Sequence, residues 1–401
     1  MAAAEGEDRR TAQDGRGPGL ITLALERCDE ALARGALDEA AVHLAAADDA
    51  LAKAEPGHRF RIALLLLRVE LEMRRGDPAR ALRLFDERVA SAPGDPELRF
   101  HRAEHLEVHG DVERAIAAYR EAQPLAAAPE QLAIGAAVAE ALSRALLSRG
   151  AVAEAEQVLM ALVERTDLAP RDPPKRSREA PRAPYGAAAV RALASIWVDR
   201  GSLAPARTLL SNALVRLEAT GLAAPEQLAG VATDIGLLEL AQERRVEAEA
   251  AFDRAIEHLA ASPRPDPAAT LELELMAASA ALAGPQPRPA SAKPHLHRAL
   301  SIATRAADPR LADVLRTLSV ARLLEDDAPG AESLAREALA IDERAPSPQI
   351  AAALSANQLG ATLLAQARTA DAQRAFDRAA KLLAGQRSDL AGLRANLGKS
   401  R

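Results

Sequence analysis

The stretch NQLGATLLAQARTADAQRAFDRAAKLL, residues 357–383, decides the fold. It contains two apolar stripes at helical spacing, and the polar run ARTAD separates them. The second stripe places Ala372, Phe376 and Ala379 at positions i, i+4 and i+7, which share one face of a helix. The small residue Gly360 lies within the first stripe. The pattern therefore predicts a hairpin of two helices that approach closely, because small side chains lie at the crossing.

The same pattern of a small, a large and a small residue returns along almost the whole chain. In most units a glycine or a polar residue precedes it by five positions and marks the turn between the two helices. The first small residue of each unit is an alanine, at Ala40, Ala81, Ala115, Ala155, Ala206, Ala248, Ala292, Ala331 and Ala372. Most of these alanines are about 40 residues apart, which predicts about nine helical hairpins.

Composition agrees with a soluble helical protein. The chain has 401 residues, of which 49% are hydrophobic, 27% are charged and only 2% are aromatic. Strands favour aromatic and β-branched residues, so we expect no sheet. The formal charge of -6 supplies no attraction for phosphate groups, so neither nucleic acid nor a membrane is an expected partner. Cys28 is the single cysteine and no signal or membrane segment is evident, which favours a cytoplasmic location.

The repeated units resemble the tetratricopeptide repeat over roughly residues 20–383. Steps near 40 residues are similar to the longer-helix variety of the repeat, found in kinesin light chain and in many bacterial regulators. The resemblance implies an all-α fold, a right-handed α-α superhelix or solenoid of about nine hairpins with a C-terminal capping helix. It also implies that a protein or a peptide is the ligand.

Proline-rich and polar segments predict the domain boundaries. We expect a disordered tail over residues 1–18, and a first array of about four repeats over residues 19–167. A linker or loop follows over residues 168–184, because its many prolines cannot donate to a helical ladder. We then expect a second array of about five repeats over residues 185–384, and a capping helix and tail over residues 385–401.

The first helix of each hairpin is expected to line the concave wall of the array. Aligning the hairpins on their turns places one set of polar residues on this wall. These candidate partner-binding residues are Glu70, Arg74, His101, Glu104, Glu140, Arg144, Arg191, Asp234, Arg316, Asn357 and Gln358. Their mixed charge suits a polar, extended peptide or a helix of a partner protein.

Three histidines raise the alternative of a metal site. His101, His105 and His109 are spaced four residues apart on one predicted helix, and such a pair can share a zinc ion. All three cannot bind one ion, because the helix rises about 12 Å over eight residues. We interpret them as a polar stripe on an ordinary helix and expect neither a metal nor a cofactor.

The sequence favours a non-enzymatic scaffold or adaptor in the cytoplasm. Catalysis needs convergent reactive groups in a pocket that excludes water, and the sequence contains no such set. The alternative is a regulatory protein that senses a peptide or another effector, or a regulatory subunit of a larger signalling complex. The abundance of alanine, and of arginine relative to lysine, indicates a GC-rich bacterial source.

Overall fold

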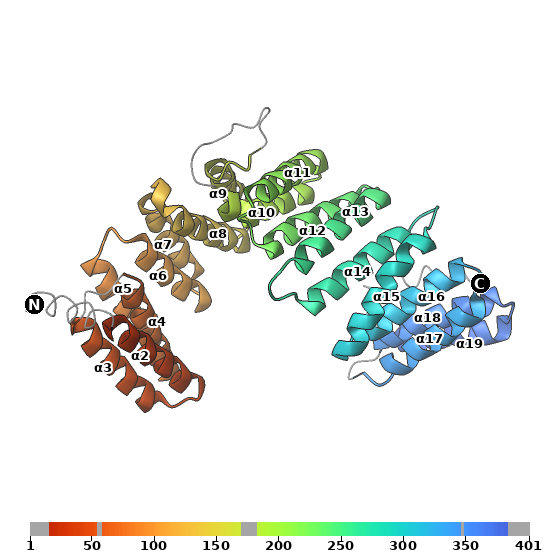
Figure 1. The fold of residues 1–401 in the computed structure, drawn as a ribbon, viewed down its shortest axis with the longest axis horizontal. Coiled ribbons are helices and arrows are strands. Elements are labelled where there is room, and N and C mark those ends of the chain that lie inside the picture. Colours follow the sequence, from red (N-terminus) through yellow and green to blue (C-terminus); the bar gives the residue numbers. More distant parts are fainter. Residues whose placement is uncertain (1–15, 54–57, 170–182, 346–348, 384–401) are drawn as a thin grey trace, which may run out of the picture. The chain divides into compact units, whose positions relative to one another are not determined.

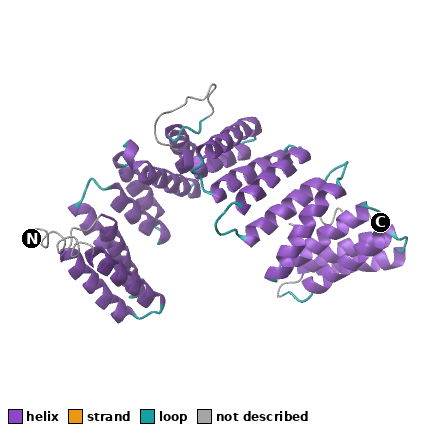
Figure 2. Ribbon diagram, viewed as in Figure 1, coloured by secondary structure: helices purple, strands orange, loops and turns teal. Residues whose placement is uncertain are grey.

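A computed structural model describes residues 16–53, 58–169, 183–345 and 349–383 of the chain (Figure 1). These residues form the α-helices α2 to α19 and two short 3-10 turns, and they contain no strand (Figure 2). The predicted all-α fold is confirmed.

Eight pairs of consecutive described helices contact each other as hairpins, and α8 and α9 follow one another in the chain at the place of the ninth expected unit. The first helices are α2 (Arg16–Ala33), α4 (His58–Arg74), α6 (Pro96–Val108), α8 (Leu132–Ser148), α10 (Ala187–Asp199), α12 (Pro225–Ala241), α14 (Pro267–Leu282), α16 (Leu311–Leu324) and α18 (Gln349–Ala365). The second helices are α3 (Leu37–Lys53), α5 (Pro78–Ser91), α7 (Val112–Leu125), α9 (Val152–Arg165), α11 (Leu203–Thr220), α13 (Arg245–Ala260), α15 (Pro289–Ala306), α17 (Ala328–Asp342) and α19 (Thr369–Leu383). The 3-10 turns are η1 (Pro129–Gln131) and η2 (Ala183–Gly186).

Two compact units divide the chain, residues 1–159 and residues 160–401. The boundary falls within α9. Of the linker expected at residues 168–184, residues 170–182 lie outside the described part of the chain, as do the residues expected to form the capping helix.

The turns between the helices follow from local backbone chemistry. Gly110 has a φ of +84°, a left-handed conformation that glycine adopts without strain, and it ends α6. Asp111 then caps α7, because its carboxylate accepts a hydrogen bond from the backbone N–H of Arg114 over 3.3 Å. The glycine and the aspartate together set the hairpin turn that the sequence predicts.

The small residues of the first helices receive the large residues of the second helices. A Cβ atom at Gly360 would lie 2.5 Å from Cε1 of Phe376, and a Cβ atom at Gly236 would lie 2.5 Å from Cε1 of Phe252. Phe252 is fully buried. The pattern of residues 357–383 therefore reflects how the two helices pack, because only a glycine at position 360 lets the ring of Phe376 lie against the helix backbone.

First helices of neighbouring hairpins contact one another within each unit. These contacts join α2 to α4 and α6 to α8 in the first unit, and α10 to α12, α14 to α16 and α16 to α18 in the second. Among the helices that the structure describes, no comparable contact joins two second helices. The first helices therefore lie on the shorter, inner side of each stack.

The expected N-terminal tail is too long by three residues. Residues 16–18 belong to α2, which begins at Arg16. Pro18 falls in the first helical turn, where the missing N–H costs no hydrogen bond, so proline and the flanking glycines do not exclude a helix there.

Candidate functional site

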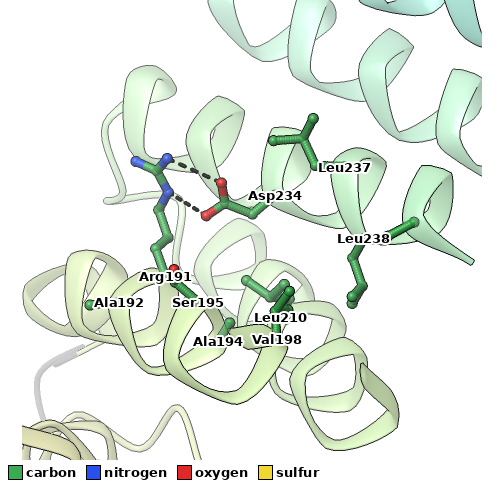
Figure 3. Close-up of a pocket in the computed structure, with 10 residues that line it drawn as sticks. Arg191, Ala192, Ala194, Ser195, Val198, Leu210, Asp234, Leu237 and Leu238 are labelled. Atoms are coloured by element: carbon green, nitrogen blue, oxygen red, sulfur yellow. Dashed lines mark hydrogen bonds and ion pairs between the residues drawn. The ribbon is translucent and has the colours of Figure 1, made fainter. Parts of the chain in front are cut away.

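An ion pair joins the inner faces of α10 and α12 in the second unit. Arg191 of α10 donates from Nε to Oδ2 of Asp234 over 2.6 Å, and from Nη2 to Oδ1 over 3.2 Å (Figure 3). The hydrogen bonds to Asp234 outweigh burial and raise the pKa of the Arg191 guanidinium above its ordinary value. The structure thus brings together two of the predicted wall residues, from neighbouring first helices.

A glycine makes room for this arginine. A Cβ atom at Gly230 of α12 would lie 2.8 Å from Nη1 of Arg191, so the guanidinium lies against the helix where a side chain is missing. Two hydrogen bonds on one side and the helix surface on the other fix the plane of the guanidinium. Gly230 was not among the candidate residues, and the sequence pattern gave no signal for it.

A hollow of about 410 Å³ lies beside the ion pair. The residues that line it with Arg191 and Asp234 are Ala192, Ala194, Ser195, Val198, Leu210, Leu237, Leu238 and Ala241. Figure 3 shows the charged pair at one side of the hollow and the side chains of Val198, Leu237 and Leu238 at the other. Leu237 is 46% exposed, although it is apolar. The site therefore combines an apolar surface open to solvent with an oriented guanidinium.

Arg316 of α16 lies in different surroundings. Its Nη1 donates to Oδ2 of Asp342 in α17 over 3.2 Å and to Oγ of Ser355 in α18 over 3.1 Å. Ser355 in turn donates to Asp342 over 2.6 Å, and Arg316 also pairs with Asp313. Because Ser355 and Asp342 are buried, this network fastens three helices together and leaves Arg316 little contact with solvent.

The last predicted wall residues lie in α18. Gln358 donates from Nε2 to the hydroxyl of Ser319 over 3.1 Å, and Ser319 donates to the backbone carbonyl of Ala331 over 2.9 Å. Gln358 is therefore part of a link between α16, α17 and α18. Asn357 is half-buried beside it.

In the first unit, a glutamate outside the predicted set organises the inner face. Glu107 of α6 accepts hydrogen bonds from Arg144 of α8 over 3.1 and 3.0 Å, and from the buried hydroxyl of Tyr119 over 2.8 Å. Burial tends to raise the pKa of Glu107, but the hydrogen bonds from Arg144 and Tyr119 outweigh it and lower the pKa. A buried tyrosine hydroxyl needs a partner, which is the signal that could have identified Glu107.

Glu140 does not pair with Arg144, although the two residues lie four positions apart on α8. Its carboxylate forms no ion pair with the residues described, because Arg144 turns to Glu107 instead. Burial raises the pKa of Glu140, and the charge of Arg144 opposes this only in part.

The other predicted wall residues of the first unit form local pairs. Glu70 accepts from Nε of Arg74 over 2.6 Å, and Arg74 also donates to the backbone carbonyl of Leu32 at the end of α2. Nδ1 of His101 lies 2.9 Å from Oε2 of Glu104.

His101 also lines a second hollow, of about 670 Å³, between α6 and α8. The ring of Phe100 and the carboxylate-bearing residues Glu97 and Glu130 share this lining. The hollow is more acidic than the one in the second unit, where the two charges cancel.

His105 of α6 and His109, which follows the helix as its C-cap, pack by ring contacts. The centroids of His105 and His109 are 4.5 Å apart, and His105 lies 5.5 Å from the ring of Phe85. Burial lowers the pKa of His105, and the neighbouring His109 adds to this effect. Among the residues described, no group of histidine, cysteine, aspartate or glutamate is arranged to hold a metal ion.

Residues 66–131 match a family model described as Tetratricopeptide repeat. These residues therefore form tetratricopeptide repeats. The match begins within α4 and covers the rest of the second hairpin, the third hairpin and the turn η1 that follows. It does not distinguish the longer-helix variety, so that subtype stays a prediction. The tetratricopeptide-repeat fold is typical of non-catalytic scaffolds for protein contacts.

Solved structures share this repeat fold, whereas no curated protein matches the chain. A Signal Transduction ATPase with Numerous Domains from Pyrococcus horikoshii, described as having a tetratricopeptide repeat sensor, is 16% identical with a TM-score of 0.55. The match covers 94% of this chain and 55% of that one, so this chain spans about half of its length.

Two Rap proteins also match. The apo form of RapI is 13% identical with a TM-score of 0.45, and the match covers 90% of this chain and 87% of RapI. A Rap protein complexed with Competence and Sporulation Factor is 13% identical with a TM-score of 0.39. The match covers 95% of this chain and 99% of that Rap protein.

Proposed function

We propose that the protein is a non-enzymatic scaffold that binds a peptide, or an exposed segment of a partner protein, along the inner face formed by its first helices. The observation that carries this proposal is the hollow between α10 and α12. Its apolar lining and the exposed side chain of Leu237 form a surface that a partner would cover.

The surrounding chemistry agrees with binding rather than catalysis. Two pairs of charged groups on the inner face form ion pairs between helices, Arg191 with Asp234 and Arg144 with Glu107. An ion pair that fixes two helices orients a donor for recognition but does not supply a base or a nucleophile. None of the helices that the structure describes has the length and apolar character needed to cross a bilayer. A cytoplasmic location and a protein or peptide partner complete the proposal.

A pair of matched variants tests this function. Leu237→Glu places a charge on the inner face, and Val215→Glu places the same charge on α11, where Val215 is 59% exposed. The tagged wild-type chain is used to capture partners from cells of the source organism, and bound proteins are identified by mass spectrometry. We expect Val215→Glu to retain the partner of the wild type and Leu237→Glu to lose it. Equal recovery by both variants would contradict binding at the inner face.

A regulator that senses a peptide or another effector is the second candidate. The Pyrococcus horikoshii protein has a tetratricopeptide repeat sensor, and a sensing role for this chain is proposed by analogy with it. For this chain, small-angle scattering with and without the captured partner separates the two functions. A sensor changes its radius of gyration when a ligand binds, whereas a scaffold of fixed shape keeps its own.

A further inference from the structure

The chemistry of the hollow between α10 and α12 restricts what it can bind. The charges of Arg191 and Asp234 cancel, so the ion pair provides no net attraction for a charged group. Beyond the pair, the lining is formed mainly by aliphatic side chains, including Ala194, Val198 and Leu238. A charged side chain that entered this hollow would lose water without gaining a partner of opposite charge. An aliphatic side chain would gain from the same transfer.

Leu237 shows which surface a ligand would cover. Leu237 and Leu238 are neighbours on α12, yet Leu238 is 3% exposed and Leu237 is 46% exposed. Leu238 belongs to the packed core, and Leu237 extends the same apolar surface to the rim of the hollow. A ligand side chain that contacts both leucines would bury the exposed apolar surface of Leu237 and so extend the hydrophobic core.

Arg191 retains hydrogen-bonding capacity beside this apolar surface. Its Nε and Nη2 donate to Asp234, whereas its Nη1 donates to none of the residues described. Asp234 and the helix surface at Gly230 fix the guanidinium, so Nη1 is held in place before a ligand arrives. A fixed donor next to an apolar hollow suits a peptide, in which each side chain is close to a backbone carbonyl oxygen.

We propose that this hollow binds one aliphatic side chain of a partner peptide, of the size of leucine or isoleucine, while Nη1 of Arg191 donates to a carbonyl oxygen of the peptide backbone. The proposal rests on the scaffold function and specifies the ligand of its inner face. Gly230 acts as a positioning residue, because a side chain there would displace the guanidinium.

A library of random twelve-residue peptides displayed on phage, selected on the full chain, is the probe. We expect the enriched peptides to share an aliphatic residue at one position. In a synthetic copy of an enriched peptide, replacing this residue by aspartate should weaken binding at least about tenfold, as measured by fluorescence anisotropy. Enriched peptides that share a charged residue and no aliphatic residue would overturn the proposal.

Variants of the protein test the two contacts separately. Leu237→Glu should weaken the binding of the synthetic peptide at least about tenfold. Val215→Glu should leave the affinity for the peptide within about twofold of the wild-type value. Arg191→Lys keeps the positive charge but removes the planar guanidinium donor. It should weaken the binding of the peptide by about tenfold. Circular dichroism confirms that each variant is folded. Affinity that is unchanged in Leu237→Glu and Arg191→Lys would overturn the assignment of the site.

The outcomes also separate this proposal from the scaffold function. If no peptide is enriched but a partner protein is captured and lost in Leu237→Glu, the aliphatic ligand is wrong and the scaffold function stands. If peptides are enriched without dependence on Leu237, binding occurs elsewhere and the ligand assignment is again wrong. If neither a peptide nor a partner is retained, both proposals fail.

Discussion

Arg191 in α10 and Arg316 in α16 occupy equivalent places in their hairpins but have different environments. The ion pair of Arg191 with Asp234 lies at the rim of a hollow, and the two side chains are 46% and 23% exposed. In the ion pair of Arg316 with Asp342, the two side chains are 16% and 8% exposed. The hydroxyl of Ser355 accepts a hydrogen bond from Arg316 and donates one to Asp342. The same residue type at the same repeat position is accessible to a ligand in one hairpin and part of the core in another.

The difference arises from where the partner carboxylate lies. Asp234 lies on α12, the next first helix, so its ion pair spans the inner face. Asp342 lies at the end of the second helix α17, which draws the guanidinium of Arg316 inward between α16, α17 and α18. A charged residue on the inner face of a repeat array therefore indicates a ligand contact only after its own partner is known.

The largest expected effect comes from removing the buried carboxylate. Asp342→Ala should lower the free energy of unfolding by about 3 kcal/mol, because the buried Ser355 loses its acceptor and the mostly buried Arg316 keeps only the more exposed Asp313 as an ion-pair partner. Asp234→Ala should lower it by at most about 1 kcal/mol, because the pair is exposed to water. Denaturant unfolding followed by circular dichroism measures both values. Equal losses would show that the two ion pairs are equivalent after all.

Two glycines on first helices give a smaller contrast. Gly360→Ala should destabilise the chain by about 1 kcal/mol, because the new Cβ atom meets the ring of Phe376 and this outweighs the better helix propensity of alanine. Gly230→Ala should change stability by less than about 0.5 kcal/mol, since the flexible side chain of Arg191 can move away.

Thermal and denaturant unfolding of both alanine variants provide the measurement. Binding of an enriched peptide provides a second one, because Gly230→Ala should weaken it while Gly360→Ala should not. A Gly230→Ala variant as unstable as Gly360→Ala would mean that Arg191 is held in the core.

The smallest expected effect is the coupling between Arg191 and Asp234. A double-mutant cycle with alanine at both positions should give about 0.5 kcal/mol at low salt, and this should fall toward zero in 1 M sodium chloride, where the Debye length is about 3 Å. The same cycle at Arg316 and Asp342 should change less with salt, because that pair is buried. Coupling at Arg191 that does not respond to salt would place its ion pair away from water.

The repeat pattern predicted the helical hairpins because its small and large residues are the ones that pack against each other where two helices cross. Gly236 and Gly360 lie where the sequence requires a small residue, and each receives an aromatic ring from the second helix. Ala372 and Ala379 are buried, as their shared face indicates. The sequence placed the N-terminal boundary three residues too late, because Pro18 is compatible with a tail and with the first turn of a helix.

The candidate site was predicted only in part. Alignment on the turns placed Arg191 and Asp234 on neighbouring first helices, and the structure pairs them. It also placed Arg144 on the inner wall, but it did not identify Glu107, with which the structure pairs Arg144. Spacing along one helix limits which residues can meet, but it does not rank them against partners that another helix supplies.

The sequence by itself determined that this protein is a series of helical hairpins, since the spacing of small and large residues is a local property that each repeat carries. The tertiary structure alone decided which inner-face charges are buried, where a hollow remains and how the guanidinium of Arg191 is held beside it. These features depend on the side chains that two or three hairpins bring together. Residues such as Gly230 and Arg191 are far apart in the sequence, and their contact exists only after the hairpins have stacked.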